Sequence, residues 1–157
     1  FFAPVLGNYA RAVSQRLPGY LTNQFGQPHL KVRDPITARH ATSQLARELL
    51  ARRRVYPVGD WSLFVENYHW LVCQSGECVG AEDEGVEKAL ERLFGQKLVE
   101  ARFDEFLELS FDLGTSLRLK SGPVDERGAA QWTLFRFQGQ SVTLENDCTL
   151  SVESASG

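Results

Sequence analysis

Apolar and polar positions alternate most clearly between residues 60 and 98. Residues 61–66 (WSLFVE) alternate with the period of two that is typical of a β-strand. Residues 69–74 (HWLVCQ) are apolar on both faces, as expected of an inner strand covered on two sides. Ser75 and Gly76 suit a two-residue hairpin loop, after which residues 77–79 return antiparallel. This register predicts that Cys73 lies directly across from Cys78.

A change of period from two to about four predicts a helix over residues 84–94. Its apolar stripe consists of Val86, Ala89, Leu90, Leu93 and Phe94. Asp83 is the expected N-cap, and Gly95 follows the last helical turn. The stripe must be buried, and the neighbouring strands are the surface available for it. The pattern therefore predicts an α+β fold.

Weaker patterns precede this central unit. Residues 8–17 (NYARAVSQRL) predict a short helix that Pro18 and Gly19 end. Strands are expected over residues 20–25 and 29–33, and a second helix over residues 36–52. Residues 55–58 are expected to be a connector, because Pro57 cannot donate a ladder hydrogen bond.

A β-meander is predicted to follow the helix. Its expected strands are residues 98–103, 106–111, 115–120, 131–137, 141–145 and 148–152, with a loop over 121–130. The whole chain, residues 1–157, is predicted to be a single α+β domain. It is expected to be a mostly antiparallel sheet or meander with one or two helices packed on one face. Within it we expect an N-terminal arm with a short helix (1–19), a hairpin plus helix (20–58), the central strands, helix and meander (59–153), and a tail (154–157).

Charge divides the chain unevenly. Residues 1–60 hold nine Arg or Lys against three acidic residues, whereas residues 61–157 hold eight against seventeen. A basic segment can indicate nucleic-acid binding, but here the acidic remainder of the chain is the nearer partner, so no specific nucleic-acid binding is expected. The longest apolar runs are shorter than a membrane span, so no membrane partner is expected. Three Cys favour a reducing compartment, and we expect a cytoplasmic protein. The chain begins without Met, which is consistent with residues preceding Phe1.

Several short motifs together resemble those of a family of small, uncharacterised bacterial proteins. They are FGQPHL (residues 25–30), GDWSL (59–63) with Trp70 further on, LFGQKL (93–98), FDLG (111–114) and WTLF (132–135). The resemblance spans roughly residues 20–150. It implies no known activity, cofactor or site residue.

Catalytic and metal-binding patterns were sought among the polar residues. The three His are scattered without the spacing of metal ligands, so no metal and no cofactor is expected. Cys73 and Cys78 are a possible thiol pair, interpreted as two buried thiols rather than a disulfide, and Cys148 as a small core residue. Four carboxylates could converge across a hairpin as an acid–base pair, namely Asp104, Glu105, Glu108 and Asp112. No nucleophile motif or phosphate loop accompanies them, which argues against an enzyme.

Aromatic residues offer the remaining route to a binding site. Most of them are expected in the core, namely Trp61, Tyr68, Trp70, Trp132, Phe135 and Phe137. Any whose strand face is left uncovered would form a contact surface. The expected ligand or partner surface comprises Tyr68, His69, Trp70 and Trp132.

Three hypotheses for function follow. The first is a non-enzymatic protein-binding module, for example a toxin-neutralising (immunity-like) or regulatory partner, acting as a monomer or homodimer. The second is a small-molecule-binding domain with an aromatic-lined pocket. The third, a hydrolase, requires a pocket with at least two convergent titratable groups.

Overall fold

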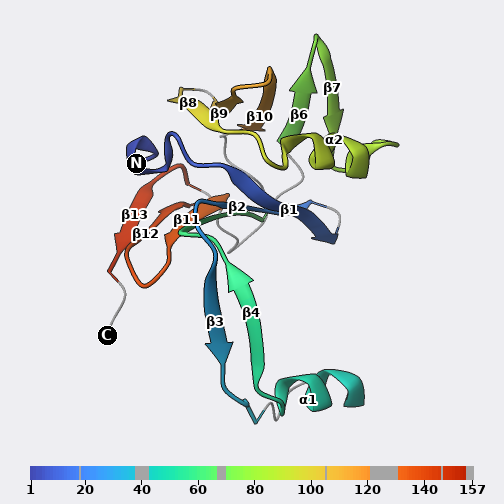
Figure 1. Ribbon diagram of the computed structural model, residues 1–157, viewed down its shortest axis with the longest axis vertical. Helices are drawn as coiled ribbons and strands as arrows, with labels where there is room; N and C mark the ends of the chain where they lie inside the picture. The colour runs from blue at the N-terminus through green and yellow to red at the C-terminus, as the bar shows by residue number, and fades with distance from the viewer. Residues whose placement is uncertain are drawn as a thin grey trace.

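The strands form two antiparallel sheets and a separate two-stranded ribbon, as shown by a computed structural model (Figure 1). The structure describes residues 1–17, 19–37, 43–66, 70–104, 106–120, 131–145 and 147–154. Within these residues every strand pair is antiparallel. The expected α+β class with mainly antiparallel pairing is confirmed, and the strands divide between sheets rather than forming one.

The larger sheet has six strands in the order β1-β2-β5-β11-β12-β13. Their bounds are β1 Ala10–Leu17, β2 Tyr20–Phe25, β5 Trp61–Val65, β11 Trp132–Arg136, β12 Ser141–Leu144 and β13 Leu150–Glu153. The second sheet has five strands in the order β7-β6-β10-β9-β8. Their bounds are β6 Trp70–Gln74, β7 Glu77–Gly80, β8 Leu98–Phe103, β9 Phe106–Phe111 and β10 Thr115–Lys120.

The inward rows of both sheets share one hydrophobic core. It is joined by the short 3-10 helix η1 (Ala3–Val5) through Val5 and by helix α2 (Val86–Leu93) through Ala89, Leu90 and Leu93. Helix α2 lies where β1 of one sheet approaches β6 and β7 of the other. It therefore contacts both sheets and covers the core at this side.

A ribbon with a helix at its far end projects from this body, and we call it the arm (Figure 1). It consists of β3 (His29–Arg33), α1 (Gln44–Leu50) and β4 (Arg54–Val58). The arm is inserted between two strands that pair with each other, because Phe25 at the end of β2 lies opposite Trp61 at the start of β5. The chain therefore leaves the sheet and re-enters it at the same place.

Three expectations for the first third of the chain are wrong. Residues 10–17 form strand β1, not a helix, because they pair with β2. Residues 55–58 belong to strand β4 rather than to a connector. Pro57 is tolerated there because each strand of a two-stranded ribbon has one unpaired edge, where a missing N–H costs no ladder hydrogen bond. Of the expected helix over 36–52, the described residues are helical over Gln44–Leu50, and none of these seven residues is buried. Residues 38–42 lie outside the described residues.

The predicted Ser75-Gly76 hairpin is confirmed, and Cys73 does pair with Cys78. The interpretation of two buried thiols is wrong, because the two residues form a disulfide across β6 and β7 with their Cα atoms 4.1 Å apart. Cys78 is exposed. Cys148 is an exposed free thiol in a turn and not a core residue. Among the described residues, no helix combines the length and the apolarity needed to span a membrane.

Candidate functional site

One face of the arm's ribbon is apolar and open to solvent. Apolar residues alternate with polar ones in β3, and the pairing with β4 places Leu30 opposite Pro57 and Val32 opposite Val55 on one face. The exposed fractions are 71% for Leu30, 56% for Val32 and 58% for Val55. A two-stranded ribbon is at best marginally stable alone in water. An uncovered apolar face on such a ribbon is a candidate contact surface.

The arm as a whole carries a net positive charge. Residues 29–58 contain seven Arg or Lys and two acidic residues, a net charge of +5. On the opposite face Lys31 lies across from Tyr56, and Arg33 lies across from Arg54. One ion pair partly offsets the charge, since Arg53 Nε lies 3.0 Å from Asp34 Oδ1.

Helix α1 at the tip of the arm also exposes apolar side chains. Ser43 caps α1 by accepting a hydrogen bond from the Ala46 backbone N–H at 3.1 Å. The helix exposes Leu45 and Leu49 on an element with no buried residue. Among the described residues, the Ile36 backbone N–H, which follows β3, donates to the Leu50 carbonyl of α1, and the Arg33 side chain of β3 donates to the Leu49 carbonyl.

A histidine–aspartate pair fixes the base of the arm. His29 Nε2 lies 2.5 Å from Asp60 Oδ1, which links the first residue of β3 to the turn before β5. The second carboxylate oxygen of Asp60 accepts the Gln27 backbone N–H at 2.6 Å. The His29 ring also stacks on Phe137, with ring centroids 4.5 Å apart. These contacts define how the arm leaves the body.

The base of the arm is hollowed on two sides. A groove of about 600 Å³ lies between the ribbon and β11. It is lined by Leu30 and Val32 of the apolar face, by Lys31 and Val58 of the other face, and by Phe135 and Phe137. A more polar pocket of about 470 Å³ lies around His29, Asp60, Trp61 and Arg136. The Arg136 guanidinium there lies over the Trp61 ring, 5.6 Å from its centroid. The groove extends the apolar face of the arm onto the body.

The hydrogen bond from His29 lowers the pKa of Asp60 below its ordinary value, and the Gln27 N–H and Arg136 act in the same direction. The carboxylate form is therefore favoured by folding. Its stabilisation is complete above the pKa of an unfolded aspartate and is lost as the pH falls through the lower folded value. We expect His29→Ala to raise the pKa of Asp60 and Arg136→Ala to raise it less. An NMR titration of the Asp60 carboxyl carbon measures both, and an Asp60 pKa unchanged by His29→Ala would contradict the pair.

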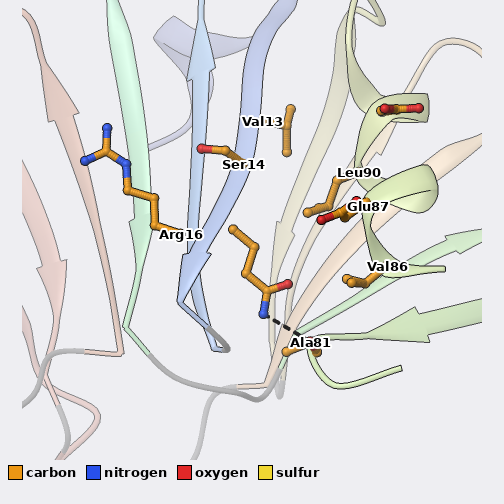
Figure 2. A pocket seen from close by; sticks show the side chains of 9 residues that line it. Val13, Ser14, Arg16, Ala81, Val86, Glu87 and Leu90 are labelled. Atoms are coloured by element: carbon orange, nitrogen blue, oxygen red, sulfur yellow. Dashed lines mark hydrogen bonds between the residues drawn. The ribbon is translucent and has the colours of Figure 1, made fainter. Parts of the chain in front are cut away.

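A second groove lies between the edge strand β1 and helix α2, and we call it the β1–α2 groove. Figure 2 shows Val13 of β1 facing Leu90 and Val86 of α2. Its volume is about 470 Å³, and Glu87 and Glu91 also line it. At one end Gln15 Nε2 donates to the Ala81 carbonyl oxygen at 3.0 Å.

The structure describes two of the four residues expected to form a ligand or partner surface, Trp70 and Trp132. Trp70 and Trp132 are each 1% exposed and belong to the core. The Trp70 indole N–H donates to the Gly19 carbonyl, and the Trp132 ring packs near Phe2 and Phe103. Tyr68 and His69 lie outside the described residues.

Two of the four carboxylates considered for an acid–base pair, Glu108 and Asp112, have different partners. Glu108 accepts from Arg118 Nε at 2.8 Å, and Asp112 accepts the Lys97 backbone N–H at 2.8 Å. Glu105 lies outside the described residues. No group of three or more potential metal ligands occurs in the part of the chain that the structure describes.

Sequence reasoning missed both the arm and the His29–Asp60 pair. The available signal was the position of His29 and Asp60 in the chain. His29 follows the end of β2 and Asp60 directly precedes β5, and these two strands pair with Phe25 opposite Trp61. Recognising that pairing would have made residues 26–60 an insertion and placed both side chains at its base. The partly uncovered aromatic residues Phe135 and Phe137 were among those considered for a contact surface.

Comparison with models of protein families, with curated proteins and with solved structures finds no match. Function must therefore be argued from the geometry of this chain.

Proposed function

We propose that this protein is a protein-binding module and that the arm is its docking element. One observation carries the proposal: the arm exposes the apolar row of Leu30, Val32, Val55 and Pro57 on a ribbon that projects from the body. Covering these side chains with a protein surface removes apolar area from water, the main favourable term in protein association. A regulatory or toxin-neutralising role is the proposed biological setting.

The chemistry of the arm favours a protein over the other partners considered. Nucleic-acid binding rests mainly on phosphate contacts, and phosphate contacts leave an apolar row such as this one uncovered. A small molecule is favoured by an enclosed apolar pocket, whereas the arm is a projecting surface. We therefore propose a protein partner whose surface is apolar at the centre and acidic around it, complementary to the basic arm.

Site-specific photo-crosslinking in the producing cell tests this function. A photoreactive phenylalanine derivative at Val32 is expected to form an adduct with protein, because Val32 lies on the apolar row. The matched control is the same substitution at Val99, an exposed valine of β8 on the body. The additional change Val55→Asp is expected to abolish the Val32 adduct by placing a charge on the same face.

The proposal fails if no protein adduct forms at Val32. It also fails if the adduct is as abundant from Val99, or if Val55→Asp leaves it unchanged. Because Val55 is exposed, Val55→Asp is expected to leave folding intact, which circular dichroism verifies.

A further inference from the structure

The β1–α2 groove presents an unpaired strand edge beside an apolar floor. Strand β1 is the last strand of its sheet, and beyond Ala10 its only pairing among the described residues is with β2. An exposed edge of this kind offers backbone N–H and C=O groups to another strand. Val13, Val86 and Leu90 form the apolar part of the groove beside that edge.

Acidic residues outnumber basic ones at this groove, because Glu87 and Glu91 line it together with one basic residue, Arg16. Residues 77–91 contain six acidic residues and one lysine, a net charge of −5. Glu87 and Glu91 of α2 line the groove and are exposed, and within the described part of the chain neither carboxylate forms an ion pair. The groove therefore suits an extended segment that combines apolar and basic side chains.

Strand β3 of the arm has this composition. Its residues 29–33 (HLKVR) alternate apolar Leu30 and Val32 with basic Lys31 and Arg33. One edge of β3 pairs with β4, and no other strand pairs with it among the described residues. The chain thus contains two strands with an unpaired edge: β3 in the basic arm, and β1 beside the β1–α2 groove.

We propose that the β1–α2 groove binds the arm of a second copy of this chain, and this inference rests on the proposed function. Strand β3 of one copy adds to the edge of β1 of the other, which is the geometry of β-augmentation. The apolar face with Leu30 and Val32 covers Val13 and Val86, which the chain itself buries only in part. Lys31 and Arg33 then lie on the other face of β3, and it is the net charge of +5 on the arm that is attracted to Glu87 and Glu91.

A second copy is favoured over the two alternatives within this molecule. The arm of the same chain points away from α2 and is fixed at its base by His29 and Asp60 (Figure 1). Direct arm-to-arm contact would oppose two elements of net charge +5, and like charges destabilise such an interface. The acidic groove supplies the opposite charge.

Charge reversal tests this pairing in purified full-length protein. Analytical ultracentrifugation of the unaltered chain is expected to show concentration-dependent self-association. The double change Glu87→Lys with Glu91→Lys is expected to weaken self-association by at least about tenfold, and so is Lys31→Glu with Arg33→Glu. Combining all four changes restores opposite charges and is expected to recover it. A mixture of the two double variants is also expected to associate, since one intact arm meets a matching groove.

Chemical crosslinking locates the contact. Equal amounts of ¹⁴N-labelled and ¹⁵N-labelled protein are mixed and treated with an amine crosslinker. Crosslinks of mixed isotope are expected between Lys31 of the arm and Lys88 of α2. Lys97, which lies over the Tyr9 ring on the body, is the internal control and is expected to give fewer with Lys31.

Three results would overturn the inference: a chain that is monomeric at every concentration, self-association unaffected by charge reversal, or mixed-isotope crosslinks that favour Lys97. The photo-crosslinking test at Val32 distinguishes failure of this inference from failure of the proposed function. A Val32 adduct with a different protein would retain arm-mediated binding and remove the second copy as its partner. The absence of any Val32 adduct would remove the proposed function itself.

Discussion

Replacing Leu93 by alanine lowers the free energy of unfolding by an expected 2–5 kcal/mol, about the range measured when a large aliphatic side chain is removed from a core. Leu93 is fully buried in α2, where the helix contacts strands of both sheets. The truncation leaves a cavity at the place where the two sheets are joined. Neighbouring side chains are held by strand pairing and have little freedom to fill it.

Urea denaturation measures this loss as a lower midpoint with an unchanged slope. Lys88→Ala in the same helix is the matched control, because Lys88 is exposed and alanine is favourable in helices. We expect this control to stay close to the parent protein. Equal midpoints for Leu93→Ala and the parent would mean that α2 is not packed on the core.

Replacing Gly59 by alanine is expected to destabilise the protein by about 1–3 kcal/mol through overpacking. A Cβ atom at Gly59 would lie 2.4 Å from the Phe25 carbonyl oxygen and 2.9 Å from the Phe25 nitrogen. Both are backbone atoms of a paired strand, so neither can move without disturbing the start of the β2–β5 ladder. The strain therefore falls at the base of the arm.

Gly80→Ala is the control for this substitution. A Cβ atom there would meet the end of the Leu71 side chain at 3.3 Å, and that side chain can adjust. We expect Gly80→Ala to cost less than Gly59→Ala in the same urea experiment. If the Gly59→Ala protein were as stable as the Gly80→Ala protein, the backbone at Gly59 would not be packed as closely against Phe25 as the structure shows.

The strands that were predicted well carry their own local signals. The β6–β7 hairpin followed from alternation and the Ser75-Gly76 turn, and its register from the loop length. The disulfide was not predicted, because the expected reducing compartment was given more weight than the short Cα separation that the register imposes on Cys73 and Cys78. Helix α2 was placed to within two residues, although Gly85 rather than Asp83 is its N-cap. Asp83 instead accepts the Gly80 N–H.

Strand β1 was mistaken for a helix for a physical reason. Its more buried positions include Arg11 and Gln15, so the sequence does not alternate in hydrophobicity although the burial does. Only pairing with β2, a contact between segments, makes this segment a strand. The candidate site was hidden similarly, since sequence arguments assign apolar residues such as Leu30 and Val55 to the core. Nothing local shows that their ribbon projects into solvent.

Because Phe25 and Trp61 lie opposite each other in the β2–β5 ladder, the length of the arm is independent of the sheet that carries it. The 35 residues from 26 to 60 occupy a place in the sheet that a tight turn could also connect. Loop-closure entropy rises only with the logarithm of length, about 0.6 kcal/mol for each doubling. Related chains could therefore lengthen, shorten or replace this insertion while the β2–β5 ladder keeps its register. The same two positions mark where a different segment can be grafted onto the sheet without a change in the β2–β5 pairing.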